Sequence, residues 1–225
     1  MGKQFNLTAS DAHSLGAYRT DPAGKPKGAM IVVQEIFGVN HHIRALCDRL
    51  AAEGYVAVAP AVFDRFVRNF ESGYTPDEIA HARSYLGNLN WDNMMKDLDA
   101  ALGDIRSVGP CGVIGFCMGG TAAFLAACRL NGLKASVAYY GGQIAKFADE
   151  KPKCPVQMHF GEKDASIPMT DVETIKQKRG GDCEIYVYKE GGHGFHCDER
   201  GSFHQESRDV AWKRTTDFFA KHMKK

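Results

Sequence analysis

The stretch Gly115-Phe116-Cys117-Met118-Gly119 ends an apolar run that starts at Cys111 and opens an alanine-rich segment that extends to Leu130. The run predicts a buried strand and the segment after it predicts a helix, so Cys117 lies at the turn between them. This is the G-x-S-x-G pattern of a nucleophile elbow, with cysteine in place of serine. A sharp turn strains the backbone at its centre, and the flanking glycines leave room for it. The sequence therefore predicts a thiol nucleophile on a strand-to-helix turn.

Other interpretations of this stretch account for fewer of its residues. Cys117 could be a small buried residue, which free cysteines often are. A dinucleotide-binding fingerprint needs G-x-G-x-x-G, whereas the glycines here stand at positions 112, 115 and 119, and a P-loop needs lysine where this chain has Thr121. The uncharged segment 107–128 could suggest a membrane helix, but Pro110 and several glycines in its first half oppose one continuous helix. We therefore favour the nucleophile.

Short apolar strands alternate with helical patterns along the chain, which is typical of a parallel α/β sheet. We predict strands at residues 29–33, 55–59, 111–116, 135–140, 156–160 and 184–188, and helices at 41–53, 76–86, 92–108, 119–130, 169–178 and 203–221. The stretch before residue 29 is expected to be irregular, and residues 64–75 and 191–202 are expected to be loops. These elements predict one α/β domain over residues 1–225, with a mostly parallel, doubly wound sheet and helices on both faces.

Composition and charge narrow the classes of partner. The chain of 225 residues carries 28 Lys and Arg against 27 Asp and Glu, a net charge of 28 − 27 = +1. It therefore lacks the surplus of basic residues that binding to nucleic acid needs. Seven scattered cysteines without C-x-x-C spacing suggest neither a disulfide framework nor a zinc ribbon. We predict a cytoplasmic protein with no nucleic-acid or membrane partner, present as a monomer or small homo-oligomer.

A candidate acid and a candidate base follow Cys117 in the chain order nucleophile, acid, histidine. Asp164 comes just after the predicted strand 156–160, where it could orient a histidine. It could equally cap the next helix, and Glu162 is the alternative acid. His193 lies in a glycine-rich loop and is the one histidine of nine in the expected place, after the acid and before the last helix. We predict that His193 is the general base and acid and that Asp164 orients it.

A partial metal-binding pattern surrounds the same histidine, because His193, His196 and Cys197 lie close together in the sequence. A zinc site needs a further matched pair of ligands, so this pattern is weak. We expect His196 and Cys197 to line a pocket or pack beneath the loop, and we predict neither a metal nor a cofactor. Four further histidines fall in helical segments and are expected to be solvated: His41, His42, His81 and His222.

Four segments together resemble the dienelactone hydrolases (carboxymethylenebutenolidases) of the α/β-hydrolase superfamily. They are Gln34-Glu35-Ile36-Phe37-Gly38-Val39-Asn40, Gly115-Phe116-Cys117-Met118-Gly119-Gly120, Gly161-Glu162-Lys163-Asp164 and Gly192-His193-Gly194-Phe195. The likeness spans about residues 25 to 222 by these segments and by element order. It implies the α/β-hydrolase fold and a hydrolase that uses Cys117, His193 and Asp164 as a triad.

The resemblance also implies roles for the segment after the first core strand. Glu35 would lie beside Cys117 and help to take its proton when substrate binds. A carboxylate after a wholly apolar strand needs a partner if it is buried, although Glu35 could equally face solvent at the strand end. The backbone N–H groups of Ile36 and Met118 would form the oxyanion hole.

Arginines bind the substrate carboxylate in this family. Arg65 resembles one of them. The second usually stands four residues after the histidine, where this chain has Cys197, and Arg200 could substitute for it. This departure means that the substrate could differ from dienelactone itself.

The chemistry of a thiol nucleophile restricts the substrate class. A thiolate is easily expelled from a tetrahedral intermediate, so its attack is productive when the substrate has a better leaving group. An enol-lactone leaves as a stabilised enolate and meets this condition, whereas an amide does not. We therefore predict hydrolysis of an enol-lactone or activated ester through a thioester acyl-enzyme. The alternatives are a broader carboxylesterase or thioesterase of the same fold, and a non-catalytic thiol sensor or binding protein.

Overall fold

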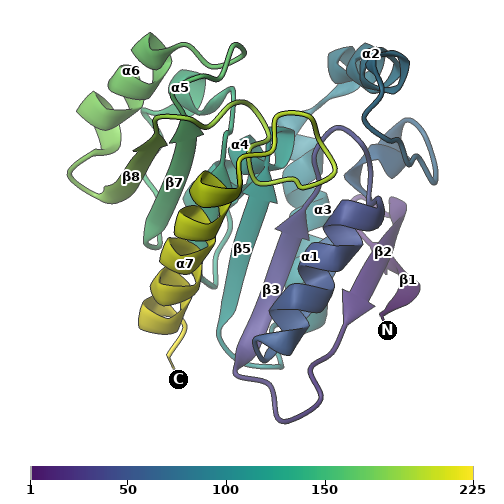
Figure 1. Cartoon of the computed structure of the whole chain (residues 1–225). Helices are drawn as coiled ribbons and strands as arrows, with labels where there is room; N and C mark the ends of the chain where they lie inside the picture. The colour runs from purple at the N-terminus through teal and green to yellow at the C-terminus, as the bar shows by residue number, and fades with distance from the viewer. Residues whose placement is uncertain (1, 225) are drawn as a thin grey trace.

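One eight-stranded sheet forms the centre of the computed structural model, which describes residues 2–224 (Figure 1). Its strands lie in the order β1-β2-β4-β3-β5-β6-β7-β8. The strand bounds are β1 Lys3–Thr8, β2 Ser14–Thr20, β3 Gly28–Val33, β4 Tyr55–Pro60, β5 Cys111–Phe116, β6 Leu133–Tyr139, β7 Val156–Gly161 and β8 Cys183–Tyr188. Strands β3 to β8 pair in parallel, and only β1 and β2 run antiparallel to their neighbours. The predicted mostly parallel sheet is confirmed.

Helices cover both faces of this sheet, as predicted. Helices α1 and α7 lie on one face, and α3 and α4 lie on the other (Figure 1). Helix α2 stands beyond the carboxyl ends of the parallel strands. The helix bounds are α1 His41–Ala52, α2 Pro76–Ser84, α3 Trp91–Ile105, α4 Met118–Arg129, α5 Ile144–Phe147, α6 Met169–Arg179 and α7 Gln205–His222, with short 3-10 helices η1 Val62–Arg65 and η2 Tyr85–Asn88. Within residues 2–224, no helix is long and apolar enough to cross a membrane.

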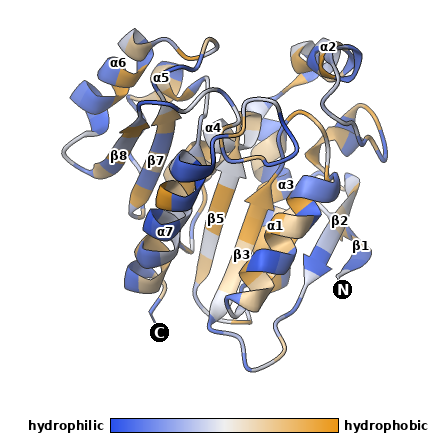
Figure 2. Ribbon diagram, viewed as in Figure 1, coloured by the Kyte–Doolittle hydropathy of each residue, from blue (hydrophilic) through white to orange (hydrophobic). Residues whose placement is uncertain are grey.

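The central strands are apolar because they are covered on both sides. Every residue of β3, β4, β5 and β7 is buried. Figure 2 shows β3 and much of β5 in the colour of hydrophobic residues, whereas α7 and the loop above it are largely hydrophilic. The apolar layers thus fix the register of the strands, and the carboxyl ends of these strands meet at one edge of the sheet.

The N-terminal stretch was expected to be irregular, and this prediction is wrong. Strands β1 and β2 form an antiparallel hairpin that extends the sheet beyond β4. Strand β1 lies at the sheet edge and buries only Leu7, so its sequence lacks the apolar run that marks the central strands. The sequence of an edge strand with one solvated face is largely polar. The four-residue helix α5 was also missed.

Candidate active site

Cys117 occupies the turn between β5 and α4 in a conformation that few side chains adopt, with φ 56° and ψ −118°. The turn is tight because backbone groups crowd its flanks. A Cβ atom on Gly115 would lie 1.8 Å from the carbonyl oxygen of Gly119, and one on Gly119 would lie 2.4 Å from the carbonyl oxygen of Val33. The two glycines are therefore required by the geometry, and the Cys117 side chain is presented at the N-terminus of α4, where backbone N–H groups are unpaired.

The predicted acid and base converge on this thiol. His193 Nε2 lies 3.0 Å from Cys117 Sγ, and His193 Nδ1 lies 2.8 Å from Asp164 Oδ2. Asp164 follows β7 and His193 follows β8, so both come from loops at the carboxyl edge of the sheet. The other oxygen of Asp164 accepts the N–H groups of Ser166 and Ile167, which fixes the carboxylate. Glu162, the alternative acid, is exposed.

The electrostatics of His193 favour its charged form. Burial by itself lowers the pKa of this imidazole, but the charge on Cys117 and the hydrogen bond to Asp164 outweigh it and raise the pKa to about 10. The Asp164 side chain is fully buried, so its interaction with the imidazolium is poorly screened by water. The arrangement can therefore keep a proton on the His193 imidazole at neutral pH.

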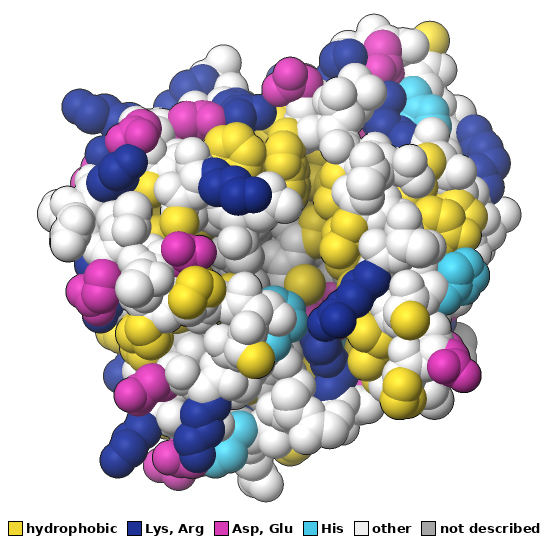
Figure 3. Space-filling model, turned by 90° about the horizontal axis from the view of Figure 1, so that it is seen from above, with side chains coloured by type: hydrophobic (Ala, Val, Ile, Leu, Met, Phe, Trp, Pro, Cys, Tyr) yellow, Lys and Arg dark blue, Asp and Glu magenta, His cyan; other side chains and the backbone are white. Residues whose placement is uncertain are grey.

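A cavity of about 200 Å³ opens directly onto the thiol. Figure 3 shows this end of the molecule hollowed near its centre, with hydrophobic side chains, Lys or Arg side chains and a histidine around the hollow. One wall is apolar and comes from α2 and the segment after it, namely Ile79, Leu86, Leu89 and Trp91. Ile36 and Met118, the predicted oxyanion-hole residues, also line the cavity. Three larger surface hollows lie elsewhere and do not border Cys117.

Glu35 is buried, and its partner is an arginine. Glu35 Oε1 accepts a 2.9 Å hydrogen bond from Arg200 Nη1, and the Glu35 side chain is only 1% exposed. Arg200 also lies over the ring of Phe37 at 5.4 Å and lines the cavity of Cys117. The structure thus brings Glu35 and Arg200 together beneath the cavity, and the hydrogen bond of Glu35 goes to Arg200 and not to the Cys117 thiol.

Arg65 was predicted as a substrate-binding residue, but the structure holds it elsewhere. Its guanidinium donates to both oxygens of Asp97, at 2.7 and 2.8 Å, and to Asp11 at 3.0 Å. These carboxylates satisfy the guanidinium, and Arg65 is not among the residues that line the cavity of Cys117. The arginine that does line it, beside Arg200, is Arg83. Sequence analysis missed Arg83, although its i,i+4 spacing from Ile79 places both residues on one face of α2.

The histidine and cysteine that follow His193 are buried beneath the loop, as expected. His196 packs among aromatic rings, with its ring centre 5.2 Å from that of Phe116 and 5.0 Å from that of Tyr139. His42 was expected to be solvated on α1, and this is wrong, because it is only 4% exposed. The apolar face of α1 continues to His42, whose ring centre lies 6.3 Å from that of Phe116.

Known proteins resemble this chain over nearly its whole length. The profile of the dienelactone hydrolase family matches residues 15–223. A provisionally named carboxymethylenebutenolidase of Synechocystis sp. is 37% identical over 87% of this chain and 86% of its own, and a carboxymethylenebutenolidase of Pseudomonas putida is 28% identical over 96% and 95%. The crystal structure of a provisionally named dienelactone hydrolase from Klebsiella pneumoniae superposes with a TM-score of 0.85 at 33% identity, over 98% of this chain and 99% of that one.

Proposed function

The chain belongs to the dienelactone hydrolase family, and we propose that it hydrolyses an enol-lactone or activated ester through a thioester on Cys117. Membership of this family, with its α/β-hydrolase fold, makes it a hydrolase that acts on ester bonds. The observation that carries the proposal is the continuous contact from Asp164 through His193 to Cys117, at 2.8 and 3.0 Å.

The reaction would begin with attack of the Cys117 thiolate on the substrate carbonyl. A carbon–sulfur bond forms, and the carbonyl electrons move onto the oxygen, which the N–H groups of Met118 and Ile36 would stabilise. Collapse of this intermediate expels the enolate, which His193 protonates. Water, deprotonated by His193, then attacks the thioester and releases the acid and the thiolate. Asp164 keeps the imidazole oriented through both steps.

The cavity supports a small, anionic substrate. Its volume of about 200 Å³ lies below the range of roughly 300 to 1,000 Å³ of sites for drug-sized ligands. Arg83 and Arg200 both line it, so a substrate carboxylate would find two guanidinium groups. The apolar wall would hold the carbon skeleton. Thiolate chemistry adds the requirement for a good leaving group, which an enol-lactone provides.

A decisive experiment compares wild type with Cys117→Ala on a dienelactone and an activated aryl ester. Loss of the nucleophile is expected to lower kcat by at least about 10³-fold, and the acyl-enzyme seen by mass spectrometry in wild type should vanish. Cys154→Ala is the matched control, because Cys154 is also half-buried but lies away from the cavity. Equal rates for wild type and Cys117→Ala would contradict the proposal.

The apolar wall favours a second candidate, a carboxylesterase or thioesterase that takes uncharged acyl groups. The wall residues Leu86, Leu89 and Trp91 carry no charge, so they can pack against an uncharged acyl group but cannot pair with an anionic one. Matched esters with and without a carboxylate separate the two candidates. A preference for the anionic ester supports the lactone hydrolase, whereas equal kcat/KM values support the broader esterase.

A further inference from the structure

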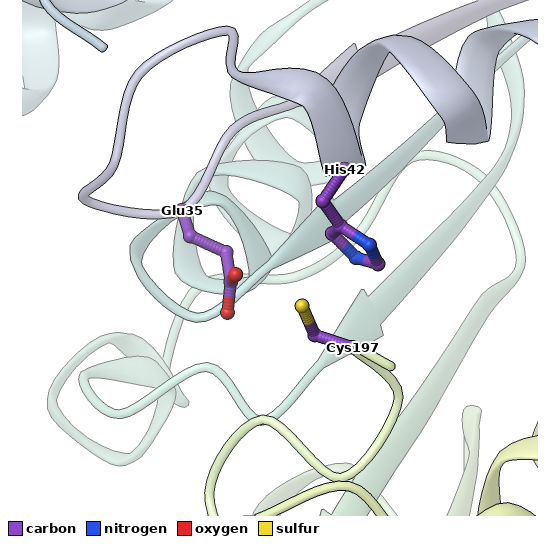
Figure 4. Close-up of side chains that lie close together, drawn as sticks. All are labelled: Glu35, His42 and Cys197. Atoms are coloured by element: carbon purple, nitrogen blue, oxygen red, sulfur yellow. The ribbon is translucent and has the colours of Figure 1, made fainter. Parts of the chain in front are cut away.

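Three buried side chains with metal-binding atoms meet beneath the cavity, and they come from three parts of the chain. Glu35 follows β3, His42 lies in the first turn of α1, and Cys197 belongs to the loop that carries His193. One ligand atom from each lies within 4.8 Å of the other two. Figure 4 shows the three side chains gathered around a shared centre. We refer to them as the Glu35–His42–Cys197 cluster.

Two polar atoms of this cluster have no hydrogen-bond partner within the described residues. Glu35 Oε2 and His42 Nε2 are both buried and unpartnered, and their residues are only 1% and 4% exposed. A buried polar atom without a partner loses its hydration and gains no hydrogen bond in return. Arg200 satisfies only the other oxygen of Glu35. The cluster therefore contains donor atoms that the protein itself leaves unused.

We propose that the Glu35–His42–Cys197 cluster binds a divalent cation of the zinc class. One thiolate, one imidazole and one carboxylate are the ligand types that Zn²⁺ takes in proteins. Bonds of about 2.0 to 2.3 Å to a central ion would set the ligand atoms roughly 3.5 Å apart. The observed separations are all within 4.8 Å, so the contraction that an ion would require is at most about 1.3 Å.

The charges of the cluster suit such an ion. The Cys197 thiol is fully buried, and a cation that binds its sulfur takes the place of its proton. Binding then forms the metal–sulfur bond and breaks the S–H bond, and the proton leaves to solvent. A doubly charged cation, the thiolate of Cys197 and the carboxylate of Glu35 sum to zero, and the Arg200 guanidinium paired with Glu35 brings the total to +1.

The surroundings provide a route of entry and a supporting contact. His42 also lies within 4.8 Å of the acidic pair Asp198 and Glu199, which are at the surface. These carboxylates place negative charge at the surface beside the His42 ring, which favours the approach of a cation. Asn40 donates a 3.0 Å hydrogen bond to the hydroxyl of Tyr74, and that hydroxyl is hydrogen-bonded to the Cys197 thiol.

The consequence for catalysis rests on the proposed function. A cation held by Glu35 would draw this carboxylate away from Arg200, which lines the cavity of Cys117. We therefore expect bound zinc to inhibit hydrolysis. Zinc could also bind Cys117 itself, so inhibition alone does not identify the site. Substitution Cys197→Ser is expected to raise the zinc concentration for half-inhibition by at least tenfold.

Cobalt provides a readout that is independent of hydrolysis, because Co²⁺ bound to a thiolate gives a charge-transfer band in the near ultraviolet. The experiment uses the full chain with Cys117→Ser, which removes the catalytic thiol. We expect one Co²⁺ per chain with this band, displaced by Zn²⁺. Adding Cys197→Ser should abolish the band, and adding His42→Gln should weaken binding at least tenfold. His41→Gln is the matched control, because His41 is the exposed neighbour on the same helix turn.

Several outcomes would overturn the site. The first is that the Cys117→Ser protein gives no Co²⁺ band although wild type does, which places the metal on the catalytic thiol. The second is that neither protein gives a band. The third is that adding Cys197→Ser leaves the band unchanged. Zinc X-ray absorption of the Cys117→Ser protein needs no variant of the cluster, so it holds even if those variants unfold. A shell with one sulfur supports the site, and a shell without sulfur contradicts it. Because this protein lacks the nucleophile, neither result depends on the proposed function.

Discussion

Arg200 Nη1 donates a 2.9 Å hydrogen bond to Glu35 Oε1, so a loop residue near the C-terminus neutralises a carboxylate at the end of β3. The two side chains are 12% and 1% exposed. A carboxylate at this depth is costly without a counter-charge. Arg200 also lines the cavity of Cys117. One guanidinium therefore serves both the stability of the site and its affinity for anions.

The stability role of Arg200 can be measured with Arg200→Met. Removing one partner of a buried ion pair leaves the other charge uncompensated, and we expect a loss of about 3–5 kcal/mol in the free energy of unfolding. Urea unfolding gives this quantity. Arg106→Met is the control, because its ion pair with Asp99 is exposed and is worth about 1 kcal/mol or less. The double variant Glu35→Gln with Arg200→Met should recover most of the loss, and a failure to recover would show that the pair is not the cause.

Substitutions of Arg83 and Arg65 are expected to differ in their effect on substrate preference. Arg83 lines the cavity, so Arg83→Gln should lower kcat/KM for a carboxylate-bearing ester about tenfold, with little change for the neutral ester. Arg65→Gln should leave this ratio unchanged and instead lower stability, because it strands the fully buried Asp97. Steady-state kinetics on the paired esters and thermal unfolding measure the two effects. A change of ratio in Arg65→Gln would restore its role at the substrate.

The elements that the sequence predicted well are those decided by local pattern. The apolar run at β5 and the glycines around Cys117 determine their own conformation, so the elbow could be located without any long-range information. Asp164 and His193 each follow a predicted strand, and this position alone indicated that they lie close together, because the carboxyl ends of parallel strands meet at one edge of the sheet.

The features that were missed depend on contacts between distant segments. Arg65 and Arg83 differ in role because Asp97, on α3, captures the first and α2 carries the second over the cavity. Likewise, the loop after His193 buries His42, and the sequence of α1 does not indicate that this loop covers it. A single sequence shows the residue types but not which distant side chains contact them in the fold.

The charged state of His193 predicts a pH dependence. Its pKa is raised to about 10, against about 6.5 for an exposed histidine, despite the opposing effect of burial. The folded state thus holds this proton more tightly than the unfolded chain. Its contribution to stability is complete below pH 6.5 and is lost as the pH rises through about 10. Histidine NMR titration should show the imidazolium persisting to alkaline pH in wild type.

The same titration in Cys117→Ala isolates the cause. The Cys117 charge is the largest of the contributions that raise the pKa of His193, so its removal should lower the titration midpoint of His193. His222, whose pKa is lowered by partial burial and which lies on α7 away from the cavity, is the internal reference and should have the same midpoint in both proteins. Identical His193 midpoints in the two proteins would mean that the thiol does not carry the charge.

The backbone at the elbow makes a prediction that separates two glycines. A methyl group on Gly115 would meet the carbonyl oxygen of Gly119 at 1.8 Å, and neither backbone can yield without moving β5 or α4. We expect Gly115→Ala to cost about 3 kcal/mol or more and to abolish activity. Gly103→Ala is the control, because a methyl group there meets nothing within 4 Å on α3. It should add about 0.5–1 kcal/mol through helix propensity. If chemical unfolding ranks both variants alike, the close approach of β5 and α4 does not constrain the turn, and the strain that presents Cys117 needs another source.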